Sequence, residues 1–165
     1  MTFGPEGERL RRRVLERLPT TLWLWKTLPL AAFAGLRVVR LDGDGCSVRL
    51  PGGWRTQNPF RSTYFAAQAM AAEMSTGAPA LVLTADAPTS VAMLVVKLNA
   101  TYAKKVVGTS VFAFEDVAGM RAAVARAAAS GEPEIFVARS VGRDAAGDVG
   151  SEFEITWSFR RRNAG

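Results

Sequence analysis

Apolar side chains in the first part of the chain recur at the spacing of an amphipathic helix. They are Leu10, Val14, Leu18 and Leu22. Lys26 and Pro29 interrupt the following apolar stretch before it reaches the length of a bilayer span. We therefore predict an N-terminal helical segment over residues 1–27 that packs on a single domain over 28–165, with no membrane span.

Beyond this helix, alternating apolar and polar positions predict a series of closely spaced strands. The expected strands are 35–41, 46–50, 80–85, 91–102, 106–114, 134–141 and 151–159. Two segments favour helices instead: an alanine-rich one over 62–76, ending at Gly77 ahead of Pro79, and an amphipathic one over 115–130. Small side chains would let the first helix sit close to a sheet, although the helix propensity of alanine explains them equally well. Because the strand connections are mostly of hairpin length, we predict an antiparallel α+β domain with one central helix.

The amino-acid composition excludes several kinds of catalytic and metal site. The 165 residues include no histidine and one cysteine, which excludes a Ser-His-Asp triad, a Cys-His pair, a His-ligated zinc and an internal disulfide. The sequence contains neither a glycine-rich phosphate loop after a strand nor a nucleophile elbow. Catalysis would have to use carboxylates, hydroxyls, amides, backbone N–H groups or a bound cofactor. Cys46 is expected to be an inert core residue.

The formal charge of +6 is concentrated near the two ends of the chain. Five arginines lie within residues 1–17 and three more at 160–162, whereas the intervening residues carry nearly equal numbers of basic and acidic side chains. Such a distribution is not that of a groove that follows a phosphate backbone. We expect no nucleic-acid partner and a cytoplasmic location; salt-dependent nucleic-acid binding through the arginine-rich ends is the weakest of the hypotheses.

One segment combines groups that suit carbonyl chemistry. Asn58 ends a loop, Tyr64 and Phe65 lie at the expected start of the central helix, and Glu73 follows on the same helix. The first N–H groups of a helix have no internal acceptor and can stabilise an oxyanion, while a buried carboxylate can act as a base. Nine residues turn a helix by about two and a half turns, so Tyr64 and Glu73 point to opposite sides. A site that uses both is most easily built across a two-fold axis between two chains.

The same segment and the order of elements resemble the hotdog-fold thioesterases of the PaaI-like type over about residues 28–160. The likeness is greater to a branch described as a domain of unknown function, which carries a similar Asn-Pro-Phe-x-Ser-x-Tyr-Phe-Ala-Ala helix. Residues 97–108 resemble the strand and basic hairpin of that family. The resemblance implies a hotdog fold, in which an antiparallel sheet wraps around a long central helix, here with an extra N-terminal helix and an inserted helix near 115–130. It also implies a homodimer or tetramer that hydrolyses or binds acyl-CoA thioesters without a metal or cofactor.

By this resemblance, Asn58 takes the family's asparagine position and Glu73 its carboxylate position. Tyr64 stands where the family has histidine, and Phe65-Ala66 stand in place of Gly-Gly. The predicted catalytic residues are Glu73, Asn58, Tyr64 and Phe65, and the predicted substrate-binding residues are Gln68, Arg61, Lys104 and Lys105.

Each of these residues also has a structural interpretation. Glu73 can pair with an arginine or reach the surface, Asn58 can form an ordinary turn, and Tyr64 can be a core residue. Gln68 can be a satisfied interior amide, and the hairpin lysines can be solvated. Trp23, Trp25 and Trp54 can line an acyl groove or simply pack. The leading hypothesis is an acyl-CoA thioesterase, and the alternative is a non-catalytic module that binds an acyl or lipid ligand.

Overall fold

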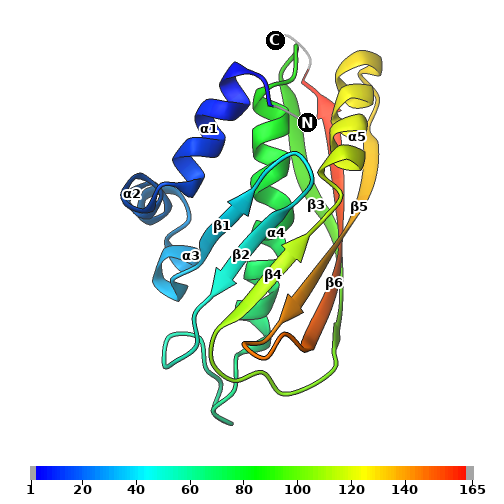
Figure 1. The fold of residues 1–165 in the computed structure, drawn as a ribbon. Coiled ribbons are helices and arrows are strands. Elements are labelled where there is room, and N and C mark those ends of the chain that lie inside the picture. The colour runs from blue at the N-terminus through cyan, green and yellow to red at the C-terminus, as the bar shows by residue number, and fades with distance from the viewer. Residues whose placement is uncertain (1–2, 163–165) are drawn as a thin grey trace.

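A six-stranded antiparallel sheet curves around one long helix, α4 (Phe65–Ala85) (Figure 1). The computed structural model describes residues 3–162, except for the side chains of residues 17–19. The strands are β1 (Arg37–Leu41), β2 (Cys46–Leu50), β3 (Val91–Tyr102), β4 (Ser110–Phe114), β5 (Glu134–Arg143) and β6 (Val149–Arg161). Their order across the sheet is β1-β2-β4-β5-β6-β3, and every neighbouring pair is antiparallel. The predicted α+β class and antiparallel sheet are confirmed.

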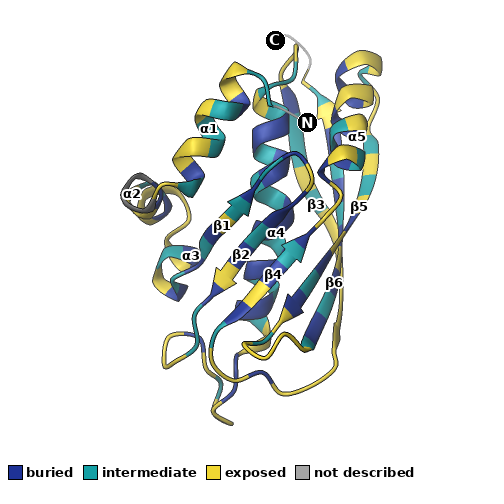
Figure 2. Ribbon diagram, in the orientation of Figure 1, coloured by how far each residue is buried: buried dark blue, intermediate teal, exposed yellow. Residues whose placement is uncertain are grey.

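Helix α4 is longer than the sequence predicts. It continues through Gly77 and Pro79 to Ala85, so the predicted helix end near Thr76 and the predicted strand over 80–85 are both wrong. Pro79 removes one helical N–H donor, but the residues around it are apolar and pack into the core, with Ala80 and Val82 fully buried. A short apolar run is compatible with a buried helix as well as with a strand. Here residues 80–85 are helical because α4 is buried on several sides. In Figure 2, α4 lies behind strands β1, β2 and β4, and most of it is coloured as buried or intermediate.

Hydrogen bonds between side chains fix the rotation of α4 against the sheet. Trp157 Nε1 donates to Thr76 Oγ1 at 3.0 Å, and the hydroxyls of Ser75 and Ser140 lie 2.8 Å apart. All four side chains are buried, so these bonds form where water cannot replace them. They leave one stripe of α4 turned away from the sheet. The stripe consists of Ala66, Ala69, Met70, Glu73, Gly77 and Leu81, all only partly buried.

The segment predicted as one N-terminal helix, residues 1–27, forms two helices, and a short third helix that we did not predict follows it. These are α1 (Pro5–Leu15), α2 (Arg17–Thr27) and α3 (Pro29–Ala34). Glu16 adopts an extended backbone with ψ 130° and breaks the first helix from the second. The predicted apolar face is interrupted as a result: Val14 is buried, Leu22 is 72% exposed, and the side chain of Leu18 lies outside the described set.

The remaining elements follow the prediction closely. Helix α5 (Val117–Ser130) is confirmed, and the Asp116 carboxylate caps it by accepting a hydrogen bond from the Gly119 N–H at 2.8 Å. β4 begins at Ser110, so the first residues of the predicted strand 106–114 are not in the sheet. Their role is to hold the loop before α4, because the Val106 carbonyl accepts from the Thr63 N–H at 2.8 Å.

Candidate active site

Glu73 lies on the outward stripe of α4 and lines an apolar cavity. This space, which we call the Glu73 cavity, has a volume of about 200 Å³ and lies between α4 and the N-terminal helices. Its walls come from α1, α2, β1, β3, α4 and the Leu28 junction between α2 and α3. The polar side-chain groups among its lining residues are the Thr20 hydroxyl, the Glu73 carboxylate and the Trp23 indole N–H. The cavity therefore joins one carboxylate to a hydrocarbon-like space.

The Glu73 carboxylate has no hydrogen-bond or ion-pair partner among the described residues, so none of the arginines whose side chains are described pairs with it. Burial raises the pKa of this carboxyl above its ordinary value, because removal from water penalises the charged form. A carboxylate with a raised pKa and free lone pairs can accept a proton from water or from a ligand.

Hydrogen bonds through Thr76 and Trp157 hold the turn of α4 that carries Glu73. The Thr76 hydroxyl donates to the Glu73 carbonyl at 2.9 Å and accepts from Trp157 Nε1 at 3.0 Å. Thr76 is fully buried and Trp157 nearly so. A chain of hydrogen bonds thus runs from strand β6 to the turn of α4 that carries the carboxylate.

The start of α4 presents free amides beside exposed aromatic rings. The Tyr64 N–H donates to the Thr56 carbonyl at 2.7 Å and is not available to a ligand. The amides of Phe65 and Ala66 in the first helical turn find no acceptor in the described chain. Phe65 is 56% exposed, and its ring contacts Tyr64 at 4.8 Å and Tyr102 at 6.3 Å between centroids. Tyr64 is also exposed, so it is not the core residue that we considered as its alternative role.

The helix separates these amides from the carboxylate within one chain. Phe65 and Glu73 are eight residues apart on α4, which corresponds to about 12 Å along the helix axis. That separation is too large for both groups to contact one thioester carbonyl. The prediction of a site shared across two chains remains a prediction.

The other predicted site residues surround the start of α4 and the nearby hairpins, and their roles also stay predictions. Asn58 Oδ1 accepts from the Phe60 N–H at 3.0 Å and the Ser62 N–H at 3.1 Å, so its side chain organises the turn. Arg61 in this turn is exposed and has a φ of 58°, in the left-handed region. Gln68 is buried and satisfied: it donates to the Thr63 carbonyl at 3.3 Å and accepts from Ser151 Oγ at 2.8 Å.

The two lysines that we predicted to bind substrate, Lys104 and Lys105, differ in their surroundings. Lys104 Nζ lies 2.7 Å from a carboxylate oxygen of Asp144 and 2.7 Å from one of Asp148. Lys105 is exposed and has no ion pair within the described residues. A phosphate that contacts Lys104 would compete with these two aspartates.

Sequence reasoning did not locate the Glu73 cavity, because its walls come from segments far apart in the chain. Trp23 lines the cavity, but Trp25 is 53% exposed and is not among the residues that line it. Trp54 is exposed and contacts Phe33 edge-on. The only sequence signal was the cluster of aromatic and leucine residues on 22–25, which did not reveal which of them face α4.

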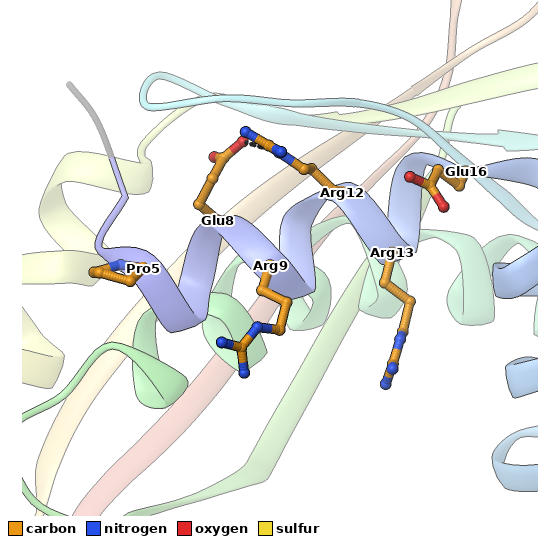
Figure 3. Close-up of a pocket in the computed structure, with 6 residues that line it drawn as sticks. All are labelled: Pro5, Glu8, Arg9, Arg12, Arg13 and Glu16. Carbon is orange, nitrogen blue, oxygen red and sulfur yellow. Dashed lines mark hydrogen bonds and ion pairs between the residues drawn. The ribbon is translucent and has the colours of Figure 1, made fainter.

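A second, shallow hollow lies on the outer surface of α1 (Figure 3). Glu8 and Arg12 point toward each other and are joined at 3.0 Å, while Arg9 and Arg13 point to the other side of the helix. Arg9 also pairs with Glu6 at 3.0 Å, so part of the positive charge is neutralised locally. In the described part of the chain, no group of three His, Cys, Asp or Glu side chains is arranged to hold a metal, and no helix is long and apolar enough to cross a bilayer.

Comparison with known structures defines the class of fold. PA5026 from Pseudomonas aeruginosa, described as a probable thioesterase, is 19% identical, with a TM-score of 0.72 over 91% of this chain and 99% of its own. The thioesterase HI1161 from Haemophilus influenzae is 14% identical, with a TM-score of 0.64 over 90% and 94%. A mutant of the thioesterase PA1618 from Pseudomonas aeruginosa is 14% identical, with a TM-score of 0.67 over 89% and 96%. The fold is therefore hotdog-like, as the resemblance implied.

The family follows from the sequence. The family described as a domain of unknown function, DUF4442, matches residues 21–159, and the chain belongs to it. No curated protein matches the sequence. At these identities the structural likeness defines the fold, and the chemistry depends on the residues that line the site.

Proposed function

We propose that this protein is a thioester hydrolase that acts on acyl thioesters of coenzyme A, with Glu73 as the general base. The observation that carries the proposal is the Glu73 carboxylate, which lines an apolar cavity on the central helix and has no partner among the described side chains. The hotdog-like fold that it shares with proteins described as thioesterases adds support.

In this mechanism, Glu73 accepts a proton from a water molecule as the water oxygen attacks the thioester carbonyl. The carbonyl carbon becomes tetrahedral, and its oxygen takes up the negative charge. The carbon–sulfur bond then breaks, the sulfur leaves with its electron pair, and the proton held by Glu73 passes to it. The products are a carboxylic acid and the free thiol of the carrier.

The oxyanion would be stabilised by the amides of Phe65 and Ala66 from a second copy of the chain. Both amides lie in the first turn of α4, where the helix dipole favours negative charge. Because about 12 Å of helix separates them from Glu73 of the same chain, two copies arranged about a two-fold axis could combine one amide pair with the other carboxylate.

Strand β3 offers the surface for such a dimer. Within the described chain its outer edge has no neighbouring strand. Leu98 pairs with Ile155 and Tyr102 pairs with Ser151 across the sheet, and Ile155 and Ser151 are buried on the helix side. Leu98 and Tyr102, in contrast, are 42% and 43% exposed. Apolar side chains that face the core side but remain uncovered are typical of a surface buried by another molecule. We propose that a second copy covers them.

The test compares hydrolysis of a panel of acyl-CoAs, from acetyl to palmitoyl, by the wild-type protein and by Glu73→Gln. The variant keeps the size of the side chain but cannot act as a base. We expect its kcat to fall by at least about 100-fold, within the usual contribution of a general base. An inactive wild-type protein, or a fully active Glu73→Gln, would refute the proposal.

A non-catalytic acyl-binding module is the second candidate, and Phe65 is the observation that favours it. The exposed ring adjoins the free amides at the start of α4 and can hinder the approach of a substrate carbonyl. This candidate predicts that acyl ligands bind, and are recovered intact by mass spectrometry, without any turnover. Phe65→Gly would then change ligand affinity but would not create an activity dependent on Glu73.

A further inference from the structure

We propose that helix α2 closes the far end of an acyl-chain pocket and that Trp23 sets the size of the apolar acyl group that the protein accepts, at about six to eight carbon atoms. The inference rests on the proposed function, because it takes Glu73 as the group that meets the thioester. It adds the class of substrate and the residue that selects it.

The chemistry of the Glu73 cavity limits what can occupy it. Of its three polar side-chain groups, the Thr20 hydroxyl already donates its hydrogen to the Arg13 carbonyl. Glu73 is the one ionisable side chain in the lining, and the Trp23 indole N–H is the one other donor there without a partner among the described residues. A polar group placed against the remaining, apolar lining would lose its hydration without gaining a partner, which is costly. The cavity therefore favours a hydrocarbon chain whose single polar end stays at Glu73.

The size of the cavity gives the length of that chain. An apolar cavity of about 150 Å³ holds one benzene molecule, which has six carbons. The Glu73 cavity, at about 200 Å³, is somewhat larger and is less regular. Its space matches an acyl group of about six to eight carbons, and longer chains must displace part of the wall.

Helix α2 supplies the wall opposite α4. Trp23 and Leu24 line the cavity from α2, and Leu28 lines it from the α2–α3 junction. On the other side, Gly77 and Ala78 of α4 present little side-chain volume. Because the indole is the largest side chain in this lining, Trp23 is the residue whose removal frees the most space.

The experiment measures kcat/KM for straight-chain acyl-CoAs from acetyl to palmitoyl with three proteins: wild type, Trp23→Ala and Trp25→Ala. Trp25 is a matched control, because it is a tryptophan on the same helix that does not line the cavity. We expect Trp23→Ala to shift the preferred substrate to longer chains, by about fourfold in kcat/KM for each added methylene that finds space. Trp25→Ala should keep the wild-type preference.

A second substitution tests the same pocket from α4, in case Trp23→Ala does not fold. Ala78→Leu fills the cavity and should shift the preference to shorter chains. Ala122→Leu, on the exposed side of α5, is its control and should have no effect. If neither Trp23→Ala nor Ala78→Leu changes the chain-length profile of an active enzyme, the inference is wrong and the proposed function stands.

A binding measurement separates the two claims when no turnover is seen. Straight-chain fatty acids from butanoate to palmitate are titrated into each protein by calorimetry. A preference for medium chains in the wild type that moves with Trp23→Ala and Ala78→Leu, but not with the controls, would support the pocket even if hydrolysis is absent. Equal affinities across all proteins and chain lengths would overturn the inference.

Discussion

Gly77 lies directly beneath the Glu73 carboxylate: a Cβ atom placed on Gly77 would stand 2.8 Å from Glu73 Oε1. The two residues are one helical turn apart on α4, and both line the Glu73 cavity. Glycine in the interior of a helix costs about 1 kcal/mol relative to alanine. The fold tolerates this cost at a point where the missing side chain leaves room for the carboxylate.

Gly77→Ala should therefore separate stability from activity. The added methyl group favours the helix but pushes the flexible end of Glu73 away from its position. We expect the free energy of unfolding to be unchanged or to rise by up to about 1 kcal/mol, whereas kcat/KM falls by about 10- to 100-fold. Chemical denaturation and acyl-CoA hydrolysis measure the two quantities. Full activity in a normally folded variant would show that the position of the carboxylate is not critical.

The raised pKa of Glu73 predicts how stability depends on pH. Between the ordinary value of 4.5 and the raised value, the folded protein holds a proton that the unfolded chain has released. Stability therefore falls as pH rises through this window. Glu73→Gln removes the ionisation, so the variant should be more stable than wild type at neutral pH, and the difference should shrink as pH is lowered toward 4.5.

Denaturant titrations at several pH values, with the exposed Glu132→Gln as a control, measure this effect. The control should follow the wild-type curve. A stability difference between Glu73→Gln and wild type that does not depend on pH would contradict the assignment of a raised pKa to Glu73.

The sequence was most informative where a pattern and a local signal agreed. Alternation, amphipathic spacing and turn residues predicted the antiparallel strands and helix α5, and the family resemblance directed attention to Glu73 on the central helix, where its catalytic role remains a prediction. The predicted helix end ahead of Pro79 was wrong. Proline disfavours a helix interior, but the burial of α4 on several sides outweighs that cost. That burial depends on the whole sheet and cannot be read from a short window.

The Glu73 cavity was beyond prediction for a related reason. Its existence depends on the break at Glu16, which lets α2 turn away from α1 and leave a space above α4. Nothing in the periodicity of residues 6–27 distinguishes one long helix from two. Likewise, the sequence could not show that the Tyr64 N–H is already bound to Thr56, because that bond forms between separate parts of a loop.

The hydrogen bond from Trp157 to Thr76 leads to a further prediction. Thr76→Val replaces the hydroxyl with a methyl group of similar size and leaves the buried indole N–H without an acceptor. We expect the free energy of unfolding to fall by about 1–3 kcal/mol, the cost of an unsatisfied buried donor. Thr76→Ser keeps the hydroxyl and loses one methyl group, so it should be less destabilised. If the serine variant is the less stable one, packing rather than the hydrogen bond dominates at this position.

The last prediction concerns Asp86, which joins the end of α4 to the start of α1. Its carboxylate accepts hydrogen bonds from the Gly4 N–H at 2.7 Å and the Gly7 N–H at 2.6 Å, so it neutralises two free donors at a helix N-terminus. Asp86→Ala should lower the free energy of unfolding by about 2 kcal/mol, because two charge-assisted bonds are lost.

The same substitution should loosen α1 and α2, which form part of the wall of the Glu73 cavity, so amide hydrogen exchange should rise across both helices in Asp86→Ala. Asp44→Ala, at an exposed turn, is the control and should leave exchange in α1 and α2 unchanged. Unaltered protection of α1 in Asp86→Ala would mean that apolar packing alone holds the helix on α4.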